Sequence, residues 1–140
     1  MRLKSAAALA AVALLTAGAA HAEIVHFSAK LTGGQEVPPN SSTAQGEVTA
    51  ELETEEHTLA YRASYTGLSG PATAAHFHGP AAPGANAPPV VTVPNPAHAG
   101  GAVRLTPQEA DDLLAGKWYF NVHTQANPGG EIRGQLQRLN

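Results

Sequence analysis

Histidine is the residue type in this sequence with the clearest capacity for chemistry. His76 and His78 flank Phe77 in an alternating segment. Because alternate residues of a strand point to the same face, we expect the two imidazoles on one face, about 6.5 to 7 Å apart, with Phe77 in the core. His123 lies in a later alternating segment, on the face opposite two aromatic residues. If these two strands are neighbours, three imidazoles meet.

The available ligand types narrow the choice of ion. The sequence has no cysteine, and its single methionine is Met1. The absence of thiolate and thioether ligands excludes a blue-copper centre and a Cu(I) methionine site, whereas imidazoles alone suit Cu(II), Zn(II) or Ni(II). The order of intrinsic affinities puts copper before zinc as the expected cofactor. The alternative is that the histidines only form hydrogen bonds that fix a neighbouring loop, or lie on a surface strand.

We expect the remaining histidines to lie on the surface, and we expect three charged residues to support the fold and not to take part in catalysis. His26, His57 and His98 fall on predicted surfaces; charged residues of interest are Glu36, Glu131 and Arg133. Glu131 and Arg133 stand two apart on a predicted strand, and Arg133 also reaches Glu36 if the first loop packs nearby. A bidentate ion pair would then fix that loop to the last hairpin. Alternatively, a carboxylate accepts the second N–H of a ligand histidine.

Composition argues against several other function classes. With 8 basic against 11 acidic residues, the chain offers no basic surface for nucleic acid. It has no cysteine nucleophile, no Gly-x-Ser-x-Gly turn and no phosphate-binding glycine loop. We therefore expect no enzyme and no nucleic-acid partner.

The N-terminus has the pattern of a secretory signal peptide, predicted over residues 1–22. Two basic residues precede an apolar run at residues 6–20, and small residues follow at the cleavage spacing. Cleavage after Ala22 leaves a domain of residues 23–140, whereas the alternative cut after Ala20 makes His21 the new N-terminus. No second apolar stretch is long enough to span a membrane after cleavage. We expect a secreted or periplasmic protein.

The remaining chain has the periodicity of short strands. Polar and apolar residues alternate over seven or eight segments separated by Gly, Pro and Asn, and between residues 79 and 101 six prolines indicate a loop with one edge strand. Thr106, Pro107 and Glu109 form a capping-box pattern that predicts one short helix at about residues 107–115. We predict an all-β fold, an antiparallel Greek-key β-sandwich of about seven or eight short strands.

Five motifs together resemble the CHRD domain, a family named after the repeats of chordin. They occupy residues 31–39, 67–70, 75–81, 119–124 and 130–135, and the resemblance extends from about His26 to Leu136. Chordin is an extracellular antagonist of bone morphogenetic proteins, so the resemblance implies an exported CHRD domain at residues 23–140 and no specific activity.

Two functional hypotheses follow. The first is an exported, non-catalytic CHRD-domain protein that binds a transition metal, copper before zinc, through His76, His78 and His123. The alternative is an extracytoplasmic protein-interaction module, with another exported protein as partner, in which the histidine and arginine motifs are purely structural. Loops on a rigid sandwich commonly carry such contacts.

Overall fold

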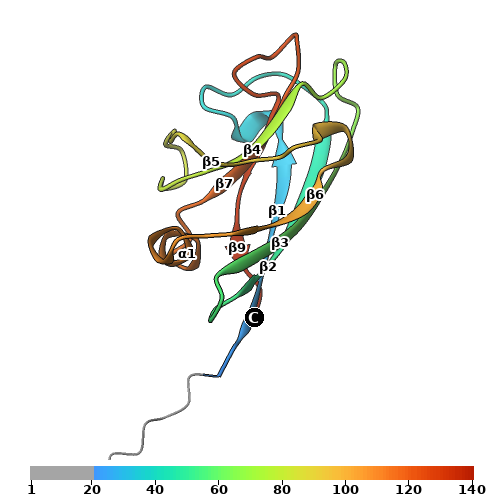
Figure 1. Cartoon of the computed structure of the whole chain (residues 1–140). Coiled ribbons are helices and arrows are strands. Elements are labelled where there is room, and N and C mark those ends of the chain that lie inside the picture. The colour runs from blue at the N-terminus through green and yellow to red at the C-terminus, as the bar shows by residue number, and fades with distance from the viewer. Residues whose placement is uncertain (1–20) are drawn as a thin grey trace, which may run out of the picture.

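The computed structural model describes residues 21–140 as one antiparallel β-structure with a single α-helix (Figure 1). All but the last two residues of the predicted signal peptide lie outside this described part. The strands are β1 (Ile24–Thr32), β2 (Gln45–Glu53), β3 (Thr58–Thr66), β4 (Ala74–His78), β5 (Pro89–Thr92), β6 (Gly100–Arg104), β7 (Tyr119–His123), β8 (Ile132–Gln135) and β9 (Gln137–Arg138). The helix is α1 (Pro107–Leu114), and two 3₁₀ turns are η1 (Gly33–Gln35) and η2 (Pro96–His98).

The strands form one continuous sheet in the order β5-β4-β7-β8-β1-β2-β3-β6, with β9 paired to β1. The sheet curves nearly into a barrel, so that β4, β5 and β7 face β2, β3 and β6 across the core (Figure 1). The rings of Tyr61 on β3 and Phe77 on β4 meet edge to face at 5.1 Å between these two layers. The predicted all-β, antiparallel fold with one short helix is confirmed, and its two layers are joined at the pairing of β1 with β8.

Alternation builds the core as the sequence predicts. On β1, Val25, Phe27, Ala29 and Leu31 are buried, while their neighbours face outward or are only partly covered. On the opposite layer, aromatic side chains fill the space between the two layers of the sheet; the largest are Trp118, Phe77 and Phe120. Because successive residues of a strand point to opposite faces, the same register that buries Phe77 directs His76 and His78 to the other side of β4.

The helix begins at the predicted capping box. The Thr106 hydroxyl accepts from the Glu109 backbone N–H, and the Glu109 carboxylate accepts from the Thr106 backbone N–H. Pro107 occupies the first turn, and Gly116 follows the helix with a positive φ of 74°. Within residues 21–140, no helix has the length and apolar character needed to cross a membrane.

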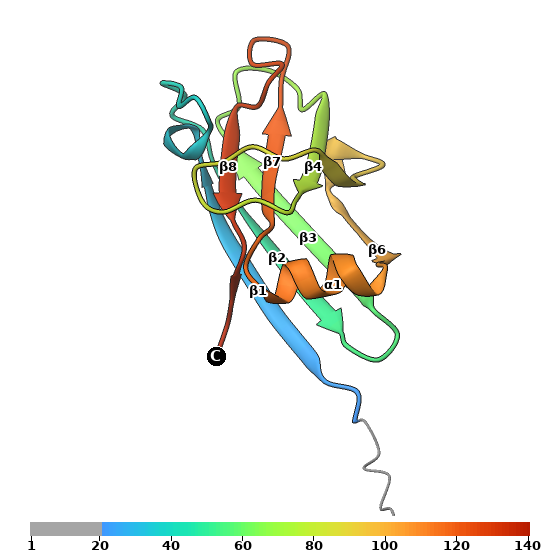
Figure 2. The same ribbon diagram turned by 90° about the vertical axis from the view of Figure 1, so that its left-hand side faces the viewer.

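Residues 79–88, here called the strap, connect β4 to β5 and carry no regular structure. Figure 2 shows this yellow-green segment crossing in front of β8, β7 and β4. Its backbone is fixed to the sheet: Ala81 N–H donates to the Lys117 carbonyl, and Gln135 Nε2 donates to the Ala81 carbonyl. The strap therefore covers the outer face of the strands that carry His76, His78 and His123.

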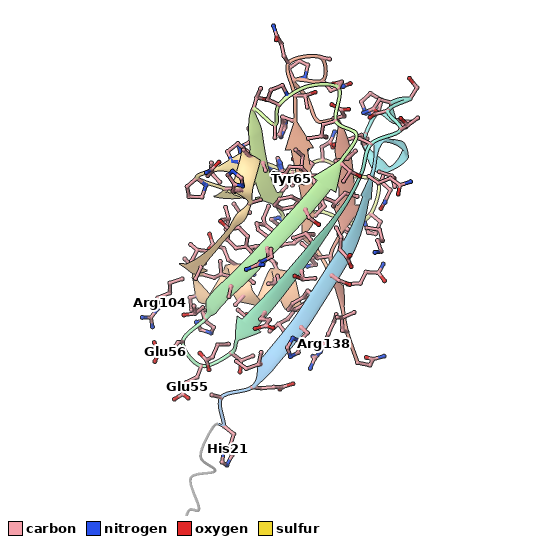
Figure 3. All side chains as sticks on the ribbon, turned by 90° about the vertical axis from the view of Figure 1, so that its right-hand side faces the viewer. His21, Glu55, Glu56, Tyr65, Arg104 and Arg138 are labelled. Atoms are coloured by element: carbon pink, nitrogen blue, oxygen red, sulfur yellow. The ribbon has the colours of Figure 1, made fainter. Side chains whose placement is uncertain are left out.

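The outer surface of β1, β2 and β3 is exposed, in contrast to the outer face of β4, β7 and β8, which the strap covers. Figure 3 shows its side chains and, at one end of the layer, Arg104 of β6 close to Glu56 in the turn between β2 and β3. Arg104 Nη2 lies 2.9 Å from Glu56 Oε2, and both side chains are largely exposed. Such surface pairs contribute little stability, and this face holds no buried charged group.

Candidate metal centre

The three predicted histidines come together because β4 and β7 are adjacent. Their register places His76 opposite Asn121, His78 opposite Tyr119 and Ala74 opposite His123. One nitrogen from each of His76, His78 and His123 lies within 4.8 Å of the others, and within the described residues this is the one such group of histidine, cysteine and acidic side chains. The three imidazoles therefore lie close together, as the sequence predicts.

His76 and His123 have the spacing of two ligands on one ion. His76 Nδ1 lies 3.1 Å from His123 Nε2. His123 Nδ1 lies 2.9 Å from the Pro128 carbonyl, which can only accept, so this nitrogen carries the proton and Nε2 presents its lone pair. Two nitrogens that each lie about 2.0 to 2.1 Å from an ion, at 90 to 109° to each other, are about 2.8 to 3.4 Å apart. The observed 3.1 Å falls within that range, and it is also the length of a hydrogen bond that His76 Nδ1 donates to His123 Nε2.

His78 is oriented by the strap and by Asn121. Its Nδ1 lies 2.8 Å from the Ala87 carbonyl, its Nε2 lies 2.8 Å from Asn121 Oδ1, and its ring stacks on Tyr119 at 4.6 Å. The Ala87 carbonyl and Asn121 Oδ1 are both acceptors, so they suit a His78 ring that is protonated on both nitrogens. A neutral ring keeps its proton on Nδ1 for Ala87, and its Nε2 then accepts from the Asn121 side chain if the amide group turns over. Nitrogens on opposite sides of an ion are about 4.2 Å apart at most. The three nitrogens lie within 4.8 Å of one another, so a small movement of the His78 ring brings it within reach as the third ligand.

The surroundings favour neutral imidazoles. Burial lowers the pKa of His76, and the charges of His123 and His78 lower it further. Burial also lowers the pKa of His78; its hydrogen bonds to Ala87 and Asn121 oppose this, and the nearby charges of His123 and Arg133 add to it. A ring must be neutral to ligate an ion, so His76 and His78 keep their lone pairs to lower pH than an ordinary histidine.

Glu131 does not reach the histidines. It is 1% exposed, and its carboxylate accepts from the Ser42, Ser69 and Thr124 hydroxyls and from the Ser69 backbone N–H. Burial alone would raise the pKa of Glu131, but the hydrogen bonds from Thr124, Ser69 and Ser42 lower it to about 2. Glu131 therefore fixes the loops after β1 and β3 to the turn between β7 and β8.

Arg133 forms no ion pair with Glu36 or Glu131, so the predicted bidentate pair is wrong. Within residues 21–140, no carboxylate lies within 4.0 Å of its guanidinium. Arg133 instead donates to Asn86 Oδ1 at 2.7 Å and to the Ala85 carbonyl, and it lies 3.4 Å from the centre of the Tyr119 ring. The physical reason is that the Arg133 guanidinium donates to oxygen atoms of the strap, while the Glu131 carboxylate already accepts hydrogen bonds from three hydroxyl groups.

Glu36 also lies outside direct reach of the histidines. Asn121 Nδ2 donates to Glu36 Oε1 over 3.4 Å, so Asn121 stands between this carboxyl and His78. Burial raises the pKa of Glu36 to about 7, although the Arg133 charge and the Asn121 hydrogen bond lower it. The predicted role of a carboxylate as acceptor for a ligand N–H is taken by the backbone carbonyls of Ala87 and Pro128.

The other histidines stay apart from the cluster. His26 lies 3.4 Å from Glu51 on the exposed face of β1 and β2, His57 has a φ of 54° in the turn after β2, and His98 is exposed in η2. Sequence reasoning missed Asn121 and Tyr119. The sequence did contain a signal for them: Tyr119 and Asn121 alternate with apolar residues of β7, as His123 does, so all three side chains point to the same face.

Comparison with known proteins gives a family and no function. The CHRD domain family model matches residues 27–136, which covers most of the chain and all of the strands that carry the site. No curated protein and no solved structure matches the chain. The matched residues contain His76, His78, His123, the strap and the carboxyl groups around them. The chain therefore belongs to the CHRD domain family.

Proposed function

We propose that this protein is an exported, non-catalytic CHRD-domain protein that binds a divalent transition metal ion, copper before zinc, through His76, His78 and His123. The single observation that carries the proposal is the 3.1 Å separation of His76 Nδ1 and His123 Nε2. It is joined by the carbonyl anchors at Ala87 and Pro128. Ligand histidines commonly donate their other N–H in this way, which fixes the ring and increases the basicity of the ligating nitrogen.

The donor set favours Cu(II) over Zn(II). Sulfur ligands are absent from the sequence apart from Met1. Hydroxyl groups hold the Glu131 carboxylate, and Asn121 stands between Glu36 and His78. For nitrogen ligands the order of affinities among first-row divalent ions peaks at copper. His76 and His123 are partly exposed, which leaves room for a water or an exogenous ligand beside the three imidazoles.

The export part of the proposal rests on the signal-peptide pattern of residues 1–22. The mass of the intact protein from its native compartment checks it, because cleavage after Ala20 or Ala22 gives two distinct masses. A protein that retains residues 1–20 would contradict export by this signal. Metal analysis of the same sample reports the ion that the protein carries in the cell.

Calorimetric titration with Cu(II) and then Zn(II) tests the metal site. We expect one Cu(II) per chain with a Kd below about 10 µM and weaker binding of Zn(II). The double substitution His76→Ala plus His123→Ala removes two preformed ligands and should abolish this binding. The matched control, His26→Ala plus His98→Ala, removes two exposed histidines and should leave it unchanged.

Two outcomes would contradict the metal function. One is the absence of saturable Cu(II) binding in the folded wild-type protein. The other is binding that survives loss of His76 and His123, because the ion would then be held elsewhere. Electron paramagnetic resonance of the Cu(II) form adds an independent check, since imidazole nitrogens produce a hyperfine pattern that oxygen ligands do not.

A further inference from the structure

A cavity next to the strap exposes two buried ionisable groups that the metal centre does not use. Its volume is about 260 Å³, and it lies between the loop after β1, the strap and β8. The polar side chains lining it include Glu36, Arg133 and Gln135, whereas Gly34 and Gly84 leave space at its walls. The cavity is distinct from the histidine cluster, because none of the three histidines lines it.

Arg133 is a buried cation with no carboxylate within 4.0 Å of its guanidinium among residues 21–140. It is 3% exposed and contacts two neutral oxygens and the Tyr119 ring. A guanidinium carries five N–H donors, and within the described residues only one on each terminal nitrogen forms a hydrogen bond. Buried arginines are normally paired, because desolvating an uncompensated charge is costly. Within residues 21–140 no fully buried side-chain nitrogen or oxygen lacks a hydrogen-bond partner, so the unpartnered Nε of Arg133 is not fully enclosed, and Arg133 lines the cavity.

Glu36 presents the complementary feature, a buried carboxyl with little hydrogen bonding. It is 6% exposed, its Oε1 has only the long contact from Asn121, and its Oε2 has no hydrogen-bond partner among residues 21–140. Gly130 leaves room for this carboxyl, since a Cβ there would overlap Oε1. The raised pKa of about 7 means that Glu36 holds a proton for part of the time near neutral pH. A protonated carboxyl is a hydrogen-bond donor.

We propose that this cavity binds a small carboxylate between Arg133 and Glu36. The ligand oxygens accept from the free guanidinium N–H groups, and one of them also accepts from the Glu36 hydroxyl. The planar guanidinium matches a carboxylate in a bidentate manner. One positive charge balances a monoanion, whereas a phosphate dianion would leave a buried negative charge beside Glu36. At about 30 Å³ for each water-sized group, the cavity of about 260 Å³ holds a ligand of up to roughly nine non-hydrogen atoms.

Acetate is the probe, and nitrogen-15 amide shifts of Gly34 and Gly84 are the readout, because both residues line the cavity. At constant ionic strength we expect saturable shifts with a Kd of about 1 to 10 mM, and weaker effects of chloride and inorganic phosphate. The variant Arg133→Gln should bind acetate at least tenfold more weakly. The control Arg104→Gln, at the exposed Glu56 pair, should bind as the wild type does.

Glu36→Gln keeps the test decisive if Arg133→Gln fails to fold. Around Glu36 the other charged or titratable groups are Arg133 on β8 and His78 on β4 across Asn121, and burial lowers the pKa of His78. Wild-type affinity for acetate should therefore fall about tenfold from pH 6 to pH 8 as Glu36 loses its proton. In Glu36→Gln the amide N–H donates at every pH, so the affinity should stay constant.

Three results would overturn the carboxylate site: no saturable shift up to about 50 mM acetate, equal binding by Arg133→Gln and Arg104→Gln, or the same pH dependence in wild type and Glu36→Gln. The site does not rest on the metal function. Acetate binding should persist in His76→Ala plus His123→Ala, so failure of one proposal is distinguishable from failure of the other.

Discussion

Asn121 is the residue that separates the histidine cluster from the cavity around Glu36. Its amide contacts His78 Nε2 on one side and Glu36 Oε1 on the other. Because Asn121 Oδ1 accepts from His78 Nε2, this contact keeps a proton on the nitrogen, whereas an ion at Nε2 needs its lone pair, so the hydrogen bond opposes ligation by His78. A hydrogen bond of this kind contributes about 0.5 to 1.5 kcal/mol net.

Replacing Asn121 by alanine should therefore strengthen metal binding. Because His78 Nε2 no longer has to give up a partner, we expect Asn121→Ala to bind Cu(II) about two- to tenfold more tightly in a calorimetric titration. Asn127→Ala is the control, since the Asn127 side chain forms no hydrogen bond within the described residues and only its backbone is used in the turn. Weaker binding by Asn121→Ala would show that the amide supports the ion.

At the scale of the element, the strap is positioned by its own carbonyl groups. Side chains from three strands donate to it: His78 and Tyr119 to the Ala87 carbonyl, Arg133 to Ala85 and Gln135 to Ala81. A loop with this composition makes few apolar contacts, so these hydrogen bonds and the start of the strap at Gly79 determine its path. Gly79 is buried against Trp118 and the Lys117 carbonyl.

A methyl group at Gly79 should displace the strap. The Cβ of an alanine would overlap Trp118 Cδ1 and approach the Lys117 carbonyl to 2.9 Å. We expect Gly79→Ala to lower the free energy of unfolding by about 1 to 3 kcal/mol in urea denaturation. It should also weaken Cu(II) binding, because the Ala87 carbonyl that orients His78 moves. Gly70→Ala, where a Cβ meets nothing within 4 Å, is the control; equal stability of the two variants would refute this role.

The strands were predictable from the sequence, whereas the strap was not. Alternation identifies β1, β2 and β3 because one face of each is buried, and the capping box fixes the start of α1. In β7 polar and apolar residues also alternate, although residues on both faces of this strand are buried. The same logic placed His76, His78 and His123 on outer faces. Residues 79–88 have no periodic pattern of polar and apolar residues, so the sequence does not predict their path. It therefore could not predict that the Ala87 carbonyl contacts His78, or that Arg133 donates to the strap and forms no ion pair with Glu36 or Glu131.

At the scale of the whole molecule, two buried carboxyls have opposite effects on stability. The pKa of Glu131 is lowered to about 2, so its contribution is complete above the unfolded value of 4.5 and is lost as the pH falls toward 2. The pKa of Glu36 is raised to about 7, so the folded state binds its proton more tightly and is destabilised as the pH rises from 4.5 through 7. The lowered pKa values of His76 and His78 have the opposite effect, because the unfolded state binds these protons more tightly and the folded state gains stability as the pH rises through part of this range.

The variant Glu36→Gln isolates the contribution of Glu36. Its free energy of unfolding relative to wild type should increase between pH 4.5 and pH 7, by at most about 3 kcal/mol, because the glutamine never ionises. Urea denaturation at several pH values measures this difference, in which the histidine and Glu131 contributions cancel. Glu55→Gln, at an exposed turn, should show no such trend. A pH-independent difference for Glu36→Gln would contradict the raised pKa.

The place of Trp118 has a practical consequence for all of these measurements. It is the single tryptophan of the sequence, it is 1% exposed, and its ring lies 5.9 Å from that of Phe77, the residue between His76 and His78. Its fluorescence therefore comes from one known position, on the inner side of the strand whose outer side carries two of the imidazoles. Paramagnetic Cu(II) quenches indole emission at short range, so the protein contains its own optical reporter and needs no attached dye.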